Sequence, residues 1–383
     1  MSAYESELSR LVDELNRSVP GVRSGERTSL DQLLALAAQR NASDMILVVG
    51  SAIALRVNGG LSAAAGKPLT HEDIRGMLLP LLTTDQSEEL QRERSLDFCF
   101  VRNSIGRFRA NFHYQRGTLA ASIRLLPPQV PSLESLHLPS VLAPLTERRQ
   151  GLILLTGPTG CGKTSTLAAL IDLINGRRRD HIITIEDPIE YQHMNRGSIV
   201  EQIEVGHDTP SFAQSIRAVL RQSPDVILVG EMRDAETMAV ALTAAETGHL
   251  VLSSLHTNDA AQTVSRILDT FPSSHQPQIR QQLSLALLAV ISQQLVPAAD
   301  GSGRYPAIEV MLATTAIRNL IRTGQDHQIR SHISVGRADG MFTMEQSLAE
   351  LVRAGRILRE TAYAHCYNQA ELRQHLDTPS RHS

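Results

Sequence analysis

The residues with the clearest chemistry form one stretch, Gly157–Thr164, which reads Gly-Pro-Thr-Gly-Cys-Gly-Lys-Thr. Its glycines allow a tight turn in which successive backbone N–H groups point at one anion. Lys163 is then expected to reach the β- and γ-phosphates of a nucleotide, and Thr164 to offer its hydroxyl to Mg²⁺. The stretch therefore predicts a nucleoside triphosphate site, with these candidate binding residues: Gly157, Pro158, Thr159, Gly160, Cys161, Gly162, Lys163, Thr164 and Ser165.

The flanks of this loop favour a phosphate site over a glycine-rich turn without a ligand. An apolar run, Leu152–Thr156, precedes it, and a helical pattern, Leu167–Ile174, follows. This order of strand, loop and helix is the context in which the motif binds phosphate. The helix N-terminus adds its own partial positive charge.

Acidic residues follow two other apolar runs, where a metal–triphosphate is expected to lie. Glu186 and Glu190 come after Ile183–Ile185, and Glu231 comes after Val226–Val229. A carboxylate there can hold Mg²⁺ through water or position the water that attacks phosphorus. We predict Glu231 for activating water, although acids at such ends also cap loops and helices.

Two histidines, His249 and His256, bracket a further apolar strand, Leu250–Leu255. A lone histidine is usually an ordinary polar residue, but a pair at the ends of one strand of a phosphate-binding sheet could sense the γ-phosphate. We therefore retain both as candidate catalytic residues.

A third candidate group lies earlier in the chain, on two alternating strands. Period two places Arg107 and Arg109 on one face of the strand 107–114, and Arg124 takes the polar phase of the strand 118–126. A solvated sheet face explains this pattern. A guanidinium cluster aimed at phosphates also explains it, because arginine presents a fixed fork to phosphate oxygens.

The elements that must position these groups suggest two domains. After the loop, strands alternate with helices, which predicts an α/β domain with a parallel sheet and nucleotide at the carboxyl ends of its strands. A long helix over 276–294 and mostly helical sequence are expected to follow. The expected strands are Leu152–Thr156, Ile182–Ile185, Val226–Val229 and Leu250–Leu255, and the expected helices Thr164–Ile174, Phe212–Arg221 and Asp234–Thr247.

The first domain is expected to be a smaller α+β sandwich of the order β-β-α-α-β-β. Its expected elements are strands at 45–49 and 53–57 joined by a turn at Asn58-Gly59, helices at 71–80 and 84–93, and the two strands with the arginines. A helix capped by Ser29 is expected to precede them, and Thr70 is expected to cap the helix 71–80. The predicted domains are an extension over 1–28 with a helix at 3–17, a domain over 29–126, a proline-rich linker over 127–148 and a domain over 149–383.

Composition narrows the function. The 383 residues carry a net charge of −3, aromatic residues make up 3%, and tryptophan is absent, which argues against a nucleic-acid partner. Three widely spaced cysteines exclude a cysteine-only zinc site and indicate a reducing compartment. Cys161 lies near a helix N-terminus, a setting that can lower a thiol pKa, but we interpret it as a small loop residue. The chain shows no apolar run long enough for a membrane span and no signal peptide, so membrane association is expected to come through partners.

Four ordered stretches resemble the Walker A, Asp box, Walker B and His box motifs of the type II/type IV secretion ATPase superfamily. Within it, the chain is similar to the twitching-motility, or PilT-like, pilus retraction ATPases. The resemblance covers roughly residues 29–375. The motifs are Gly157–Thr164, Ile185–Tyr191, Gly230–Asp234 and Thr247–Asn258, joined by the group's signature at Ala316–Arg322 and by Arg107–Arg109 and Gln115–Gly117 in the first domain.

This resemblance implies a PAS-like N-terminal α+β domain and a RecA-like P-loop domain with a helical C-terminal part, assembled as a homohexamer. It implies ATP and Mg²⁺ as cofactors, with Thr164 and Glu231 at the metal and Glu231 as the Walker B glutamate. It gives the His box a role in catalysis or coupling. Arg107, Arg109 and Arg124 match arginines that reach the nucleotide across the domain interface.

The implied function is an ATP-driven motor for type IV pilus retraction. Its implied place is the cytoplasm, at the inner membrane below the pilus, where it acts on the pilus platform protein. A paralogous retraction ATPase is a further candidate partner. Extension and secretion ATPases of the superfamily commonly carry a four-cysteine zinc insertion, and its absence here favours retraction.

The chain departs from the pattern at a few places. Asp44–Leu47 lacks the usual histidine, Cys161 and Thr164 stand where serine is common, and residues 1–28 are unmatched. Three alternatives to the retraction motor remain: a pilus assembly or type II secretion motor, a nucleic-acid translocase, and an adaptor that binds ATP and barely hydrolyses it.

Overall fold

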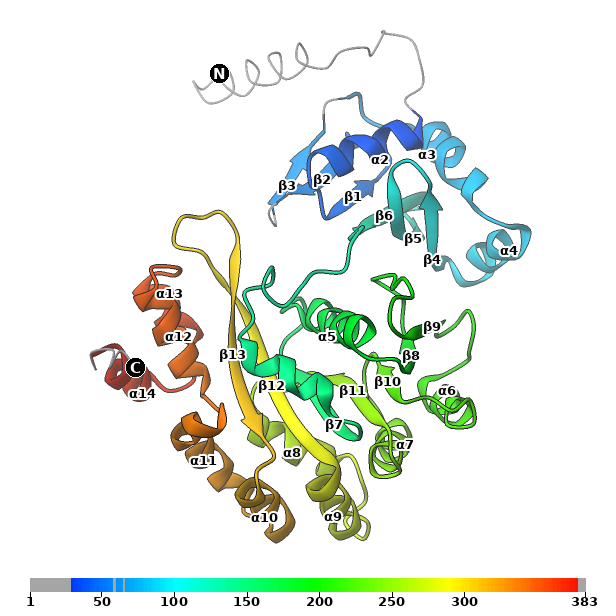
Figure 1. Ribbon diagram of the computed structural model, residues 1–383. Coiled ribbons are helices and arrows are strands. Elements are labelled where there is room, and N and C mark those ends of the chain that lie inside the picture. Colours follow the sequence, from blue (N-terminus) through cyan, green and yellow to red (C-terminus); the bar gives the residue numbers. More distant parts are fainter. Residues whose placement is uncertain (1–28, 58–59, 65, 378–383) are drawn as a thin grey trace. The chain divides into compact units, whose positions relative to one another are not determined.

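The computed structural model describes residues 29–57, 60–64 and 66–377, in two compact units, Met1–Pro128 and Gln129–Ser383 (Figure 1). Each unit has its own sheet and its own hydrophobic core. The predicted extension 1–28 with its helix, and the predicted turn at Asn58-Gly59, lie outside the described residues.

The first unit is built on a six-stranded antiparallel sheet with the strand order β3-β2-β1-β6-β5-β4. Two of its strands, β3 and β4, add to the predicted β-β-α-α-β-β order. All four residues of β3 are exposed, and β4 contains consecutive apolar residues, so neither shows a clear period of two. The strands are β1 (Asp44–Leu47), β2 (Ala54–Val57), β3 (Gly60–Ala63), β4 (Ser95–Arg102), β5 (Gly106–Gln115) and β6 (Thr118–Leu126), and the helices are α2 (Leu30–Gln39), α3 (His71–Leu78), η1 (Leu79–Leu81) and α4 (Thr84–Glu93).

Side-chain caps fix where the helices of the first unit begin. The Ser29 hydroxyl accepts a hydrogen bond from the Gln32 backbone N–H, and the Gln32 side chain accepts one from the Ser29 N–H. Thr70 and Asp73 make the same reciprocal pair at α3. Both predicted N-termini are confirmed, because such boxes satisfy N–H groups that have no partner within the helix.

The second unit contains a seven-stranded sheet with the order β13-β12-β7-β11-β10-β8-β9. Neighbouring strands are parallel except at one edge, where β13 runs antiparallel to β12. The four predicted strands are confirmed. The strands are β7 (Gly151–Thr156), β8 (His181–Glu186), β9 (Ile199–Glu204), β10 (Val226–Val229), β11 (Leu250–Leu255), β12 (Leu287–Pro297) and β13 (Arg304–Leu312).

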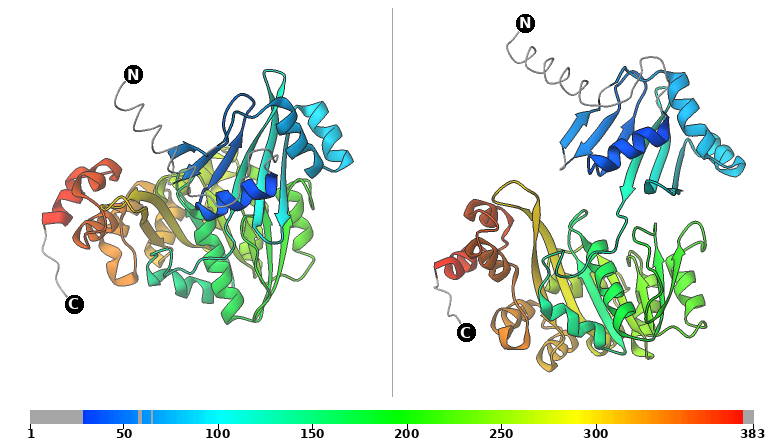
Figure 2. Two further views of the ribbon diagram at one scale, coloured as in Figure 1. Left: turned by 90° about the horizontal axis from the view of Figure 1, so that it is seen from above. Right: turned by 45° about the horizontal axis from the view of Figure 1, so that its top comes forward.

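Helices cover both faces of this sheet (Figure 2). Leu152 and Leu154 of β7 pack toward one set of helices, α6 to α11, while Ile153 and Leu155 pack toward α5. Every residue of β7, β10 and β11 is buried, as expected for parallel strands inside an α/β fold. The helices are α5 (Lys163–Arg177), α6 (Phe212–Val219), α7 (Ala235–Glu246), α8 (Ala260–Asp269), α9 (Gln276–Ala286), α10 (Thr315–Thr323), η3 (Asp326–Gln328), α11 (Ile329–Val335), η4 (Gly336–Asp339), α12 (Met344–Arg353), α13 (Arg359–His365) and α14 (Gln369–Asp377).

The prediction of one long helix over residues 276–294 is wrong. Helix α9 ends at Ala286, Leu287 adopts an extended conformation, and the chain continues as β12 between β7 and β13. The apolar run that begins at Leu287 fits a buried strand as well as a buried helix, and periodicity alone cannot separate them. The pairing partners β7 and β13 decide the outcome, so the C-terminal region is less helical than predicted.

The predicted linker over residues 127–148 is also different from expectation, because from Gln129 onward it belongs to the second unit. Its residues Ser140–Glu147 form a 3₁₀ helix, η2, that contains Pro144. Leucines of this segment are buried against α5 and the sheet: Leu133, Leu138, Leu142 and Leu145. The prolines prevent regular helix, but the leucines make the segment part of the core.

None of the described helices combines the length and the apolar composition that a bilayer-spanning helix requires.

Candidate active site

The loop between β7 and α5 has the geometry of a phosphate cradle. Gly157 and Gly162 have φ angles of 139° and 91°, in a region that only glycine adopts readily. A Cβ atom on Gly157 would lie 2.2 Å from the backbone oxygen of Gln293, so no larger residue fits there. Gly162 is the N-cap of α5, which brings the loop directly to the positive end of that helix.

Lys163 is drawn back over this loop. Its Nζ atom donates hydrogen bonds to the backbone oxygens of Gly157, at 2.7 Å, and Pro158, at 3.1 Å. The side chain is buried, and burial lowers the pKa of Lys163, while the nearby Cys161 and Glu231 oppose that shift. An ammonium group held among loop carbonyls is positioned to exchange them for phosphate oxygens.

Cys161 does not have the lowered thiol pKa that a helix N-terminus can produce. It is 3% exposed, and burial raises the pKa of its thiol more than the neighbouring Lys163 lowers it. The interpretation of Cys161 as a small packed loop residue fits this environment.

The next two hydroxyl residues differ in their surroundings. The Ser165 hydroxyl lies 2.8 Å from the hydroxyl of Tyr191, a buried residue after β8. Thr164 is half-buried in the first turn of α5, beside Lys163. A hydroxyl oxygen is a hard ligand of the kind that Mg²⁺ prefers, and Mg²⁺ in nucleotide sites takes one or two protein ligands together with phosphates. Thr164 therefore remains the candidate ligand for the metal.

Glu231 lies just beyond the end of β10 and is paired with two basic side chains. Its Oε1 lies 2.7 Å from a guanidinium nitrogen of Arg233, and its Oε2 lies 3.5 Å from Nε2 of His256. The carboxylate is 15% exposed and acts electrostatically on Lys163. The structure therefore brings Glu231, His256 and Lys163 together at the carboxyl edge of the sheet.

The backbone before Glu231 is held by its neighbours on both sides. The N–H of Gly230 donates to the oxygen of Ile185 at 2.8 Å, and the Ser254 hydroxyl donates to the oxygen of Gly230 at 2.6 Å. A Cβ atom on Gly230 would lie 3.3 Å from the Ile185 oxygen, so any larger residue would need a small shift of the neighbouring backbone.

Glu186 ends β8 and is 7% exposed. It accepts hydrogen bonds from the Thr184 hydroxyl, at 2.7 Å, and from the Gln202 side chain, at 3.2 Å. A carboxylate bonded in this way is suited to ordering the loop, and its predicted catalytic role stays a prediction. Glu190 is half-buried beside Tyr191, whose pKa is raised mainly by burial and further by Glu190, so it remains a candidate.

The loop after β8 is attached to α5 by Asn175, a residue that is completely buried. Its side chain donates to the oxygen of Met194 at 2.8 Å and accepts from the N–H of Arg196 at 3.1 Å. Its backbone oxygen accepts from the N–H groups of Gly197 and Ser198. These bonds and the Ser165–Tyr191 contact hold the loop that carries Glu190 against the helix that follows the phosphate cradle.

The two predicted histidines are separated by the whole length of β11. His256 follows its carboxyl end and lies beside Glu231, whereas His249 precedes its amino end and bonds through Nδ1 to the oxygen of Ala244 at 3.0 Å. A strand of this length spans ~20 Å. Because parallel strands present only their carboxyl ends to the loop, His256 lies at the loop's edge of the sheet and His249 at the opposite edge. The catalytic roles predicted for the two histidines stay predictions.

The predicted arginines share one face of the first unit's sheet. Arg109 lies directly across from Arg124, which lies across from Asp44, and Asp44 lies across from Arg56. Asp44 pairs with Arg124 at 2.9 Å and with Arg56 at 3.6 Å. We call this set of neighbouring residues the arginine row: Arg56, Asp44, Arg124 and Arg109. Arg107 lies two residues before Arg109, on the same face.

The opposite face of this sheet forms the core, with Phe108 and Phe112 buried. The predicted alternation is therefore confirmed. Arg109 lies 3.8 Å from Asp97, at the outer limit of an ion pair, so its guanidinium is only weakly held. The row fits a solvated face and a phosphate-binding face equally well.

Sequence reasoning missed two residues of β12, Ser292 at the end of β7 and Gln293 at the loop. The Thr156 hydroxyl donates to the Ser292 hydroxyl at 2.8 Å, and the side chain of Gln293 bonds to Cys161 and Thr166. The available signal was a polar Ser-Gln-Gln triplet after an apolar run, which a long helix does not explain.

Glu309 of β13 supports the start of α8, the helix that follows His256 along the chain. Glu309 is 1% exposed, and its Oε1 accepts a hydrogen bond from the N–H of Ala260 at 2.9 Å. Burial raises the pKa of Glu309 to about 7.

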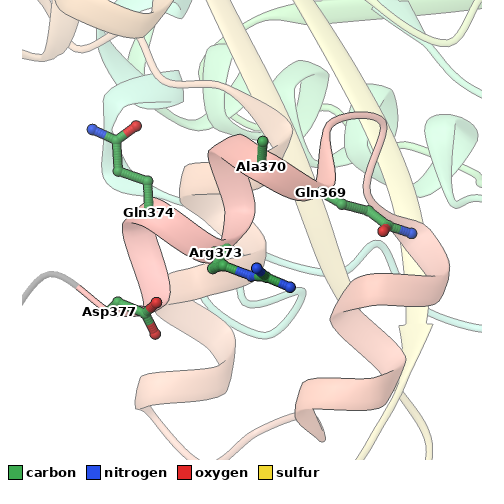
Figure 3. Close-up of a pocket in the computed structure, with 5 residues that line it drawn as sticks. All are labelled: Gln369, Ala370, Arg373, Gln374 and Asp377. Carbon is green, nitrogen blue, oxygen red and sulfur yellow. The ribbon is translucent and has the colours of Figure 1, made fainter.

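A surface hollow on α14 lies outside this site. Its lining residues all belong to that one helix, and Figure 3 shows their side chains spreading in different directions, so they offer no converging groups for a ligand. They are Gln369, Ala370, Arg373, Gln374 and Asp377.

Comparisons with known proteins agree with this geometry. The family described as Type II/IV secretion system protein matches residues 122–375. The chain belongs to this family. A twitching motility protein of Neisseria gonorrhoeae is 44% identical over 319 residues, which cover 83% of this chain and 85% of the relative. These matches confirm the resemblance found in the motifs.

A second relative and a solved structure agree with this assignment. The type IV pilus retractation ATPase PilT of Pseudomonas aeruginosa is 41% identical over 333 residues, which cover 87% of this chain and 96% of the relative. A crystal structure of the pilus retraction motor PilT with bound ADP matches with a TM-score of 0.84 and 44% identity, over 90% of this chain and 99% of that chain. Family and relatives together make the chain an ATPase with the α/β fold of PilT.

Proposed function

We propose that the chain is a motor that hydrolyses ATP to retract type IV pili, and that it works as a homohexamer. The observation that carries the proposal is the meeting of Lys163, Glu231 and His256 at one sheet edge, beside the loop Gly157–Thr164. The similarity to retraction ATPases along most of both chains supports the direction of the work.

The loop residues Gly157–Ser165 bind the phosphates of ATP through backbone N–H groups and Lys163. Thr164 would hold Mg²⁺ through its hydroxyl, and Glu231 would support the metal through water. When bound, Mg²⁺ neutralises charge on the β- and γ-phosphates.

Glu231 is the residue that acts on the attacking water. It orients the water and receives its proton while the water oxygen bonds to the γ-phosphorus and the bond from that phosphorus to ADP breaks. Arg233 and His256 hold the carboxylate in place from two sides. His256 also contacts the group whose charge changes during hydrolysis, which suits it to coupling the reaction to movement.

The first unit has the role of a PAS-like domain and the second that of a RecA-like domain. Arg107, Arg109 and Arg124 reach the nucleotide from the first unit, where their guanidinium groups stabilise the charge of the transferring phosphoryl group, and Arg109 is the one whose ion pair, with Asp97, is long at 3.8 Å. Closure around ATP and opening after product release then move one domain against the other.

The partners of this motor are further copies of the chain and the inner-membrane platform protein of the pilus, with a paralogous retraction ATPase as an additional partner. The protein works in the cytoplasm at the base of the pilus. Nucleic acid is not its substrate, in keeping with the net charge of −3.

Deletion of the gene, followed by counting of surface pili, tests the direction of the work. We expect hyperpiliated cells that do not retract their pili, restored by the intact gene and not by a Lys163→Ala copy. Bald cells would instead identify an assembly or secretion motor. Many-fold stimulation of the purified ATPase by DNA would identify a translocase.

A further inference from the structure

The phosphate loop rests on one side chain, that of Gln293 on β12, which neither the motifs nor the comparisons assign. Gln293 is 3% exposed although it is polar. Its Nε2 donates to the backbone oxygen of Cys161 at 2.7 Å, and its Oε1 accepts from the Thr166 hydroxyl at 2.9 Å. One amide therefore joins the loop, the first turns of α5 and the central sheet.

The chemistry of the partners fixes the orientation of this amide. A backbone oxygen can only accept, so the NH₂ group must face Cys161, and the carbonyl oxygen then faces the Thr166 hydroxyl. The loop backbone also packs closely against this amide: a Cβ atom on Gly162 would lie only 2.9 Å from Nε2 of Gln293. The loop and the glutamine fit one another in one arrangement only.

The bond to Cys161 also determines where an N–H group of the loop points. The oxygen of Cys161 and the N–H of Gly162 belong to the same planar trans peptide, in which they point in opposite directions. Holding that oxygen against β12 therefore turns the Gly162 N–H away from β12. This N–H belongs to the set that the loop motif uses for phosphate.

We propose that Gln293 is a positioning residue for nucleotide binding, which sets the orientation of the Cys161–Gly162 peptide and so of a phosphate-binding N–H. It acts through the loop and does not itself touch the nucleotide. Its contribution is expected in affinity, because a correctly oriented N–H binds the phosphates of ATP and of ADP alike.

Two substitutions test this by titration of purified protein with Mg²⁺-ADP. Gln293→Met keeps the volume but leaves the buried oxygen of Cys161 without its donor, and we expect Kd to rise about tenfold. Gln293→Glu places an acceptor against that oxygen and should raise Kd further. KM for ATP should rise with Kd, while kcat changes less than about threefold, since Lys163 and Glu231 are unchanged.

Gln294→Met is the matched control. Gln294 is the next residue of the same strand, and its side chain contacts His365 and Tyr367 of the C-terminal region. This variant also loses side-chain hydrogen bonds, but we expect Kd for ADP to stay at the wild-type value.

Isothermal titration gives Kd separately from the fraction of competent sites, so partial unfolding of a variant does not imitate weaker binding. A purely structural role would lower that fraction and leave Kd unchanged. Wild-type Kd in either Gln293 variant would overturn the proposal. If neither variant retains sites, Thr166→Val decides, because it removes the anchor of the Gln293 carbonyl and should raise Kd about threefold; wild-type affinity there would equally overturn it.

Discussion

The two sheets of this protein present their polar groups in different ways. In the second unit both faces of the sheet are covered, so β7, β10 and β11 are wholly buried, and chemistry is confined to the loops at the strand ends. In the first unit one face is covered and the other carries the row from Arg56 to Arg109 along adjacent strands. A covered sheet concentrates its functional groups at an edge, whereas a half-covered sheet distributes them over a surface.

The largest effect should come from the edge of the covered sheet. Lys163→Ala removes the cation of the phosphate cradle, and we expect turnover to fall about a thousandfold, with loss of nucleotide binding. Release of phosphate by purified protein and binding of ADP measure the two effects. Wild-type turnover in this variant would contradict the assignment of the site.

Glu231→Gln, at the same edge, keeps the size of the side chain and removes its ability to accept a proton. Turnover should fall roughly a hundredfold while ATP still binds. The same measurement separates a motor from an adaptor, since an adaptor would hydrolyse ATP barely faster than this variant does.

Substitution in the arginine row tests most directly whether the half-covered sheet has a function of its own. Arg109→Ala should lower kcat roughly thirtyfold, because it removes one of the groups that stabilise the charge of the transferring phosphoryl group. KM should change little, because the neighbouring arginines remain to share the phosphate charge. Arg92→Ala is the control, since Arg92 is an exposed arginine of α4 paired with its neighbour Glu93. Equal kinetics in the two variants would make the row a solvated face.

The two ends of β11 should also behave differently. His256→Ala removes a partner of Glu231 and should lower kcat about fivefold, whereas His249→Ala should stay within about a factor of two. Assays of monomeric and assembled protein should be run side by side. A large loss from His249→Ala confined to assembled protein would place that residue at a subunit contact.

Substitution of Glu309 should have the smallest effect on activity and a clear effect on stability. Its pKa is raised from the ordinary value to about 7, so the folded chain binds a proton more tightly than the unfolded chain. Stability therefore falls as the pH rises toward 7 and stays low above it, at a cost of at most about 3 kcal/mol. Glu309→Gln should raise Tm at pH 8 and leave it nearly unchanged at pH 4; equal shifts at both values would refute the burial argument.

Sequence reasoning succeeded where local pattern and tertiary environment agree. The flanks of Gly157–Thr164, the alternation around Arg109 and the cap at Ser29 each depend on neighbours in the chain. It failed at β12, and it did not foresee the hydrogen bonds of Glu186. An apolar run becomes a strand only when β7 and β13 lie beside it, and a carboxylate loses its freedom only when Gln202 reaches it from another strand.

The attachment of the loop after β8 by Asn175 has a consequence for how the chain tolerates change. Residues 194–198 have no helix or strand to set their length, yet four hydrogen bonds to one asparagine fix where each peptide must lie. Insertion of even one residue there would move every later peptide of the segment away from its hydrogen-bond partner on Asn175. Surface loops usually accept tags and extra residues, but this one should reject them as a core strand would.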